Sequence, residues 1–250
     1  MNPILVALDV PDAEAAVSLA TQLTPYVGGF KVGLELLMGE GPDVIRRVGA
    51  LGAPVFADAK LHDIPNTVRG AARQLARAGA RWVTVHGGGG REMIEAAVAG
   101  LEGDGESGVL VVTVLTSLGE VQLKETGIDR SLESQVVAIT TLAAQAGAEG
   151  IVCSVLEAGA AREAAPSLKV VTPGIRSSDA ALDDQKRVGT LTEALDAGAD
   201  MVVVGRAITA AADVVAAARA LALEAGQSIP PPRERSGGWG ESRRSREVGF

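Results

Sequence analysis

The sequence predicts an α/β fold: a single (β/α)₈ barrel, in which each of eight parallel strands is followed by a helix. Short β-branched runs alternate with alanine-rich, charged stretches of helical character, which is typical of parallel strands joined by helices. The tripeptide Ala-Gly-Ala recurs at residues 78–80, 146–148 and 197–199, each time between a helical stretch and a strand-like run. The length of 250 residues suits one such barrel, or two ordinary domains.

Each predicted strand is a short β-branched run, and a predicted helix follows it. The expected strands are Ile4–Asp9, Gly29–Gly33, Val55–Lys60, Trp82–His86, Val109–Val114, Gly150–Ser154, Lys169–Thr172 and Met201–Gly205. The expected helices lie near residues 12–24, 41–50, 65–78, 90–101, 131–146, 156–164, 189–197 and 206–225. Glycine just past a helix removes the steric cost of a left-handed turn, so the repeated Ala-Gly-Ala marks helix ends. The even spacing of these units favours a closed barrel over an open sheet.

Composition limits what the protein can be. It is 47% hydrophobic and 22% charged, which is enough apolar material for a large core. The net charge of −8 argues against a nucleic-acid partner, because phosphate binding requires a basic surface. One cysteine and two histidines exclude a disulfide framework and a histidine-rich metal centre. With no apolar run of membrane length and no signal-like start, we expect a soluble, cytoplasmic protein without a membrane partner.

The last 24 residues differ from the rest. Residues 227–250 contain three consecutive prolines, paired glycines, serines and five arginines, with almost no apolar periodicity. We therefore divide the chain into a barrel domain at 1–226 and a flexible tail at 227–250. The tail is interpreted as a solvated appendage rather than an arginine-rich contact arm, because it mixes both charge signs and has no helical face.

Charged residues gather where the expected strands end, which is where barrels of this kind place their active sites. Asp9 ends the first strand and Lys31 lies in the second. Asp58 and Lys60 are two apart on the third strand, so their side chains leave the same face. Inward charges are costly unless paired, so we expect Lys31 and Asp63 to complete an alternating Lys–Asp–Lys–Asp array. The alternative is a salt-bridge cluster on the surface.

Other polar features receive simpler interpretations. Gly87–Gly90 looks like a phosphate cradle but lacks the Lys-Ser/Thr of a P-loop, so a turn that packs His86 against the following helix is favoured. His86 is given no role, and His62 is expected to contribute only shape. Cys153 is interpreted as a small buried hydrophobe.

The run DAKLHDIPNT at residues 58–67 resembles the signature of the orotidine 5′-phosphate decarboxylase family. Further landmarks follow in the family's order. They are Leu5–Asp9, Phe30–Gly33, Val111–Ser117, Thr172–Arg176 and Val203–Arg206. D-x-K-x-x-D by itself is shared with related sugar-phosphate barrels, whereas its combination with Lys31 and both arginine loops is specific. The resemblance covers residues from about 3 to 225 and leaves out the tail.

The resemblance implies cofactor-free decarboxylation of orotidine 5′-phosphate to uridine 5′-phosphate and CO₂ in de novo pyrimidine biosynthesis, with no metal. Lys60 would donate a proton to C6 between Asp58 and Asp63, with Lys31 completing the catalytic set. Asp63, Ile64 and Thr67 would reach a neighbouring subunit's site, so that the working unit would be a homodimer with shared active sites. The implied substrate-binding residues are Asp9, Lys31 and Asp58 near the ribose and carboxylate, Ile64 and Thr67 from the partner, Thr116 at the pyrimidine edge, and Arg176, Gln185, Gly205 and Arg206 at the phosphate.

Elementary chemistry agrees with these roles. Decarboxylation leaves an electron pair on carbon, and without a visible cofactor site the burden falls on electrostatics fixed before the reaction. Two alternatives stay open. One is a magnesium-dependent sugar-phosphate decarboxylase or aldolase, in which the position of Lys31 is a carboxylate; a lysine repels Mg²⁺ and argues against it. The other is a silent barrel that binds a nucleotide as a sensor, which is expected to have lost Lys60 or Asp58.

Overall fold

The eight strands close into a barrel in which every neighbouring pair is parallel, with β1 hydrogen-bonded to β8. The computed structural model describes residues 2–103, 106–175 and 187–228. Its strands are β1 (Ile4–Ala7), β2 (Gly29–Val32), β3 (Val55–Leu61), β4 (Trp82–His86), β5 (Gly108–Val112), β6 (Gly150–Val152), β7 (Lys169–Pro173) and β8 (Met201–Val204). Every strand bound lies within two residues of its prediction, and the predicted fold class is confirmed.

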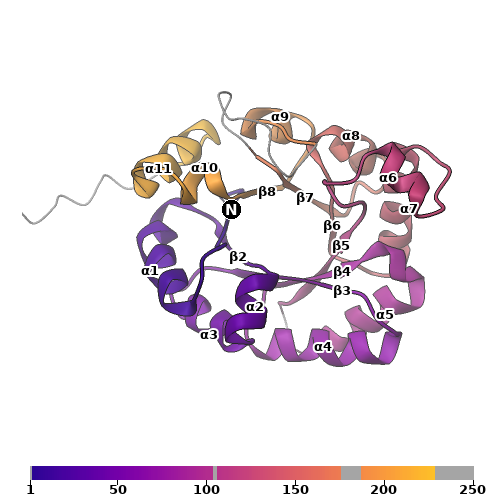
Figure 1. Ribbon diagram of the computed structural model, residues 1–250, viewed down its shortest axis with the longest axis horizontal. Coiled ribbons are helices and arrows are strands. Elements are labelled where there is room, and N and C mark those ends of the chain that lie inside the picture. Colours follow the sequence, from indigo (N-terminus) through magenta and orange to yellow (C-terminus); the bar gives the residue numbers. More distant parts are fainter. Residues whose placement is uncertain (1, 104–105, 176–186, 229–250) are drawn as a thin grey trace, which may run out of the picture.

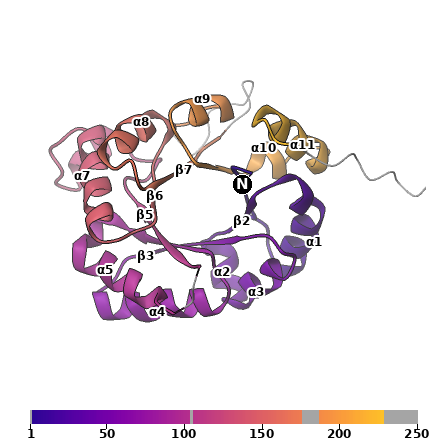
Figure 2. The same cartoon turned by 180° about the vertical axis from the view of Figure 1, so that it is seen from behind.

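Helices form an outer layer around the strands, as Figures 1 and 2 show from opposite sides. They are α1 (Ala13–Leu23), α2 (Leu34–Glu40), α3 (Asp43–Gly49), α4 (Pro65–Arg77), α5 (Gly90–Leu101), α6 (Glu120–Glu125), α7 (Leu132–Gln145), α8 (Val155–Ala164), α9 (Leu191–Asp196), α10 (Arg206–Thr209) and α11 (Val214–Glu224). Short 3₁₀ turns η1 (Thr24–Tyr26) and η2 (Gly87–Gly89) accompany them.

The helix predictions were wrong in three places. Helices α2 and α6 were missed, because both are short and lie in segments that the sequence assigned to loops. Gly41, with a φ of 70°, separates α2 from α3. The single helix expected at 206–225 is two helices, and the second begins where the Asp213 carboxylate accepts a hydrogen bond from the Ala216 N–H.

The repeated Ala-Gly-Ala does end helices as predicted. Gly79, Gly147 and Gly198 all have positive φ, from 75° to 96°. After the first of them, the Ala80 N–H donates to the Leu75 carbonyl, five residues back, in the pattern that closes a helix. Each such turn sends the chain directly into the next strand, which keeps the barrel regular.

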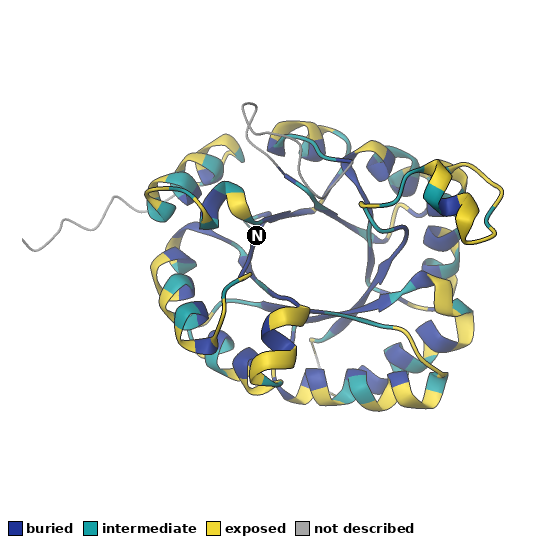
Figure 3. Ribbon diagram, in the orientation of Figure 1, coloured by how far each residue is buried: buried dark blue, intermediate teal, exposed yellow. Residues whose placement is uncertain are grey.

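The core has two layers. A large cluster fills the space between the strands and the inward faces of the helices, visible as the dark inner sides of the ribbons in Figure 3. A second cluster fills the barrel interior and includes Leu5, Phe56 and Trp82, all almost fully buried. Strand alternation separates the layers, since Leu5 points inward and its neighbours Ile4 and Val6 point outward. Because the barrel interior is apolar, polar side chains that could act in catalysis must lie at the strand ends.

In the ranges that the structure describes, no helix is both long enough and apolar enough to cross a membrane. Cys153 is buried, as predicted, and burial raises the pKa of its thiol to about 12. The predicted tail lies almost entirely outside the described residues, so the division at residue 226 stays a prediction.

Candidate active site

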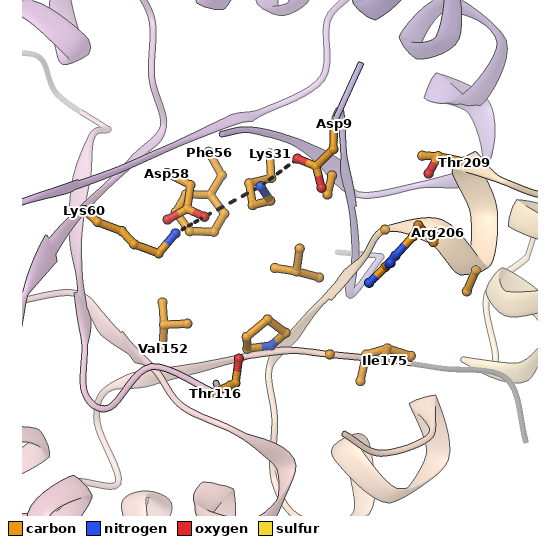
Figure 4. Close-up of a pocket in the computed structure, with 16 residues that line it drawn as sticks. Asp9, Lys31, Phe56, Asp58, Lys60, Thr116, Val152, Ile175, Arg206 and Thr209 are labelled. Atoms are coloured by element: carbon orange, nitrogen blue, oxygen red, sulfur yellow. Dashed lines mark hydrogen bonds and ion pairs between the residues drawn. The ribbon is translucent and has the colours of Figure 1, made fainter. Parts of the chain in front are cut away.

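A cavity of about 460 Å³ opens at the carboxyl ends of the strands. Its apolar floor is formed by Ala7, Phe56 and Val203, which belong to the cluster inside the barrel. Polar residues rise around that floor (Figure 4). They are Asp9, Lys31, Asp58, Lys60, Thr116 and Arg206, contributed by strand ends on opposite sides of the barrel. With Gly205, which also lines the cavity, seven residues predicted from the sequence meet in one pocket.

Four of these side chains form a continuous chain of alternating charge. The Lys60 ammonium lies 2.7 Å from Asp58 Oδ2, and the Lys31 ammonium lies 3.6 Å from the same oxygen. Lys31 also contacts Asp9 Oδ1 at 3.3 Å. Asp58 is the most enclosed member of the chain, with 11% of its side chain exposed, against 13% for Lys31 and 59% for Asp9. The order is Asp9–Lys31–Asp58–Lys60, and a splayed surface cluster is excluded.

Strand β3 is not a regular strand where it carries this chemistry. Its register with β4 runs from Ala57↔Val83 to Leu61↔Val85, so two extra residues bulge out of β3. Lys60, inside the bulge, has a φ of 46°, unusual for a residue with a side chain. The same-face argument thus gave the right pairing of Asp58 with Lys60, although a bulge rather than plain alternation produces it.

The three predicted residues that follow β3 lie away from this cavity. Asp63, Ile64 and Thr67 are exposed, and Ile64 keeps 67% of its surface open. The Asp63 carboxylate accepts a hydrogen bond from the Ile64 N–H at 2.6 Å, and it forms no ion pair with Lys60 within the chain. Within this chain, Asp63 therefore does not complete the predicted Lys–Asp–Lys–Asp array. Its contribution from a partner stays a prediction.

The predicted phosphate residues divide into two groups. Gly205 and Arg206 line the cavity where β8 ends, and the Arg206 guanidinium points into it (Figure 4). Arg206 begins α10, as predicted, but this helix has only four residues. Arg176 and Gln185 lie outside the described residues. Thr116 lines the cavity across from Lys31, in the loop after β5.

Sequence reasoning missed Arg187, which fixes the loop that carries Thr116. Its guanidinium is buried and donates to the carbonyls of Val114 and Leu115, at 3.2 and 3.0 Å. It also forms an ion pair with Glu157 at 2.6 Å, and both partners are more than 90% buried. No local signal marks Arg187, because its partners come from distant segments of the chain.

The glycine run after β4 forms a tight turn, as predicted, rather than a phosphate cradle. The Gly88 N–H donates to His86 Nδ1 at 3.1 Å, and a side chain at Gly89 would collide with Met93 of α5. His86 stacks on His62, with ring centroids 5.1 Å apart. Burial, with the charges of His62 and Lys60, lowers the pKa of His86. The imidazole Nδ1 thus acts as an acceptor that holds the turn.

The comparisons with known proteins decide the family. The Orotidine 5′-phosphate decarboxylase / HUMPS family matches residues 2–221. The chain belongs to this family. It is accordingly an enzyme of the orotidine 5′-phosphate decarboxylase type, and this family acts in pyrimidine biosynthesis. The resemblance seen in residues 58–67 is confirmed.

Relatives in this decarboxylase family are similar along most of the chain. Orotidine 5′-phosphate decarboxylase of Anaeromyxobacter sp. (strain K) is 52% identical over 81% of this chain and 89% of its own. That of Moorella thermoacetica is 48% identical over 82% and 84%. The crystal structure of the Lactobacillus acidophilus decarboxylase superposes with a TM-score of 0.78 at 36% identity, covering 90% of this chain and 99% of its own. That of Pyrococcus horikoshii OT3 gives 0.74 at 29% identity, covering 90% of this chain and 100% of its own.

Proposed function

We propose that the protein converts orotidine 5′-phosphate to uridine 5′-phosphate and CO₂ without a cofactor, and that Lys60 donates the proton. The observation that carries the proposal is the Lys60 ammonium held 2.7 Å from Asp58 above an apolar floor. A positive charge fixed in place before the substrate binds costs no reorganisation during the reaction. Such a charge can stabilise an electron pair that forms on a neighbouring carbon.

The step balances without a redox partner. The bond between C6 and its carboxylate breaks, CO₂ leaves, and the electron pair stays on C6. A proton moves from the Lys60 ammonium to C6, which completes the uridine nucleotide, and the neutral amine then regains a proton from water. Asp58 holds the Lys60 ammonium in place through an ion pair at 2.7 Å, and Lys31 contacts the same carboxylate oxygen at 3.6 Å.

The charge balance of the cavity suits a phosphorylated carboxylic acid. Three cationic side chains face two carboxylates among its described residues, and this leaves positive charge for an anionic ligand. In the proposal Arg206 and Gly205 bind the phosphate together with Arg176 and Gln185. Asp9 and Lys31 bind the ribose hydroxyls, and Thr116 contacts the pyrimidine edge. Phosphate binding far from C6 supplies energy that can be realised in the transition state.

Asp58 has a second proposed role. It would lie close to the departing carboxylate, and the loss of CO₂ would relieve the repulsion between the two anions. Asp63, Ile64 and Thr67 are proposed to enter the site of a second subunit. Their exposure, including the 67% open surface of Ile64, supports this arrangement. The working unit would then be a cytoplasmic homodimer with shared active sites.

The position of Lys31 argues against the magnesium-dependent alternative. Its ammonium lies between Asp9 and Asp58, at 3.3 and 3.6 Å, where a cation bound by those two carboxylates would have to sit. Within the described residues, no group of three or more His, Cys, Asp or Glu side chains is placed to hold a metal.

The test is an ultraviolet assay of orotidine 5′-phosphate consumption by the purified protein after treatment with a chelator. We expect full turnover with chelator present and no gain when Mg²⁺ is added. Activity that disappears with chelator and returns with Mg²⁺ would establish the metal-dependent alternative. Tight binding of uridine 5′-phosphate with no turnover would establish a nucleotide sensor instead.

A further inference from the structure

Thr84, in the middle of β4, makes two hydrogen bonds to the residues of the charged chain. Its hydroxyl accepts from the Lys60 backbone N–H at 2.8 Å and donates to Asp58 Oδ1 at 3.1 Å. The residue is completely buried and does not line the cavity. We infer that Thr84 is a positioning residue for the decarboxylation proposed above, acting through Lys60 and Asp58.

The first bond holds the bulge of β3. The pairing of β3 with β4 skips from Ala57 to Leu61, so Lys60 falls where the register between the strands is broken. The Thr84 hydroxyl takes up its N–H instead of a backbone carbonyl. A buried N–H without a partner is costly, and a non-glycine residue with a φ of 46° persists only where its surroundings enforce it. Thr84 satisfies the N–H and so retains the bulge that aims Lys60 into the cavity.

The second bond sets the rotation of the Asp58 carboxylate. With Oδ1 bound to Thr84, the other oxygen, Oδ2, is left to face both ammonium groups. A hydroxyl has one proton to donate and lone pairs to accept with, so one group can serve both bonds. The backbone N–H of Lys60 and the carboxylate of Asp58 are therefore both hydrogen-bonded to the Thr84 hydroxyl oxygen.

Removal of this hydroxyl should affect the chemical step more than substrate binding. Among the described residues, the groups proposed to hold ribose and phosphate lie in or just after β1, β2 and β8, whereas the hydroxyl of Thr84 bonds to Lys60 and Asp58. A misplacement of about 1 Å in a reacting group can cost about 100-fold in rate. Thr84→Val keeps the branched shape preferred in strands but removes both hydrogen bonds. Thr84→Ser keeps the hydroxyl.

The matched control is Thr113→Val. Thr113 is also buried and follows the neighbouring strand β5, but its hydroxyl donates only to the Val152 carbonyl, at 2.9 Å. The Thr113→Val variant therefore loses a buried hydroxyl but leaves the hydrogen bonds of the charged chain intact. A general effect of burying valine in place of threonine would be equal in the two variants.

The experiment measures kcat and KM for orotidine 5′-phosphate and the Kd for uridine 5′-phosphate in wild type and all variants. For Thr84→Val we expect kcat to fall about 100-fold, with KM and Kd within about threefold of wild type. Thr84→Ser should recover kcat to within about fivefold, and Thr113→Val should change kcat by less than about threefold. If Thr84→Val does not fold, Thr84→Ala is measured in its place.

Three results would overturn the inference: an unchanged kcat for Thr84→Val, an equal loss in Thr113→Val, or no recovery in Thr84→Ser. A failure of the proposed function looks different, because wild type itself would then bind uridine 5′-phosphate without consuming the orotidine nucleotide. The two failures are thus told apart by the wild-type measurement.

Discussion

The two ends of the barrel both carry buried charge, but they use it in opposite ways. At the amino-terminal end, Glu149 lies at the start of β6 and uses both carboxylate oxygens. Arg81 donates to it through two nitrogens, each at 2.7 Å, and Lys169 and the Trp82 indole N–H donate at 2.6 and 3.1 Å. The cluster is closed, since its carboxylate is surrounded by donors from the starts of β4 and β7.

The pKa of Glu149 reports how complete this closure is. Burial alone would raise the pKa, but the hydrogen bonds from Arg81, Lys169 and Trp82 outweigh burial and lower it from 4.5 to about 2. At the carboxyl-terminal end, two ammonium groups compete for one oxygen of Asp58, and a cavity of about 460 Å³ lies beside them. In our proposal, one end uses its charges to stabilise the fold, whereas the other keeps charge available for a ligand.

An Asp→Asn substitution made at each end of the barrel should give the largest difference in kcat/KM. Asp58→Asn removes the anion between Lys31 and Lys60, and we expect kcat/KM to fall by about 1000-fold or more, as the loss of fixed electrostatic stabilisation requires. Asp200→Asn at the opposite end alters a carboxylate that accepts from the Val170 N–H at 2.7 Å. It should leave kcat/KM within about twofold. Equal losses in both variants would abolish the distinction between the ends.

The next effect concerns the phosphate side of the cavity. Arg206→Ala removes a cationic fork donor that points into the pocket. We expect kcat/KM to fall about 100-fold, mostly through a higher KM, because a charge-assisted hydrogen bond contributes about 1.5–3 kcal/mol. Steady-state kinetics measures it, with Arg46→Ala on the exposed face of α3 as the control. An unchanged KM would remove Arg206 from substrate binding.

A change at the closed cluster should act on stability instead. Glu149→Ala leaves Arg81 and Lys169 without their carboxylate, so the free energy of unfolding should fall by about 2 kcal/mol. Urea titration measures this value, and kcat/KM should be unchanged. Glu163→Ala, at an exposed site on α8, should cost less than about 0.5 kcal/mol. If kcat/KM fell with Glu149→Ala while the free energy of unfolding did not, the assignment of this cluster to stability would be contradicted.

The smallest effect is a pH dependence. The pKa of Glu149 is lower in the folded chain than in the unfolded chain, so protons bind the unfolded chain more readily and acid favours unfolding. The contribution of Glu149 is fully present above pH 4.5 and is lost as the pH falls towards about 2. The stability difference between wild type and Glu149→Gln should therefore narrow over that window. A difference that stays constant down to pH 2 would contradict the lowered pKa.

The fold and half of the site could be predicted because both follow from local pattern. Strand positions were readable from β-branched runs, and parallel strands bring their carboxyl ends to one rim, which gathers Asp9, Lys31 and Asp58. The bulge at Lys60 could not be predicted, because the Lys60 N–H there bonds to a hydroxyl of the next strand, which no local pattern shows. Arg187 was missed for the same reason, since its partners are far away in the sequence.

Asp63 shows the limit of the charge-pairing argument. Spacing suggested that it would join Lys60, yet in the folded chain it turns to the Ile64 N–H. Sequence spacing places residues on a rim but does not say which subunit's cavity they enter. Family resemblance supplied that expectation, and a single chain leaves it as a proposal.

The most direct test of the central claim is the turnover of orotidine 5′-phosphate by Lys60→Ala, measured beside its affinity for uridine 5′-phosphate. If the Lys60 ammonium stabilises and protonates C6, turnover should fall by about 1000-fold or more while nucleotide affinity stays within about fivefold. Lys124→Ala, at an exposed position on α6, should match wild type in both measurements. Turnover by Lys60→Ala within about tenfold of wild type would contradict the account, since general acid catalysis contributes at least about 100-fold.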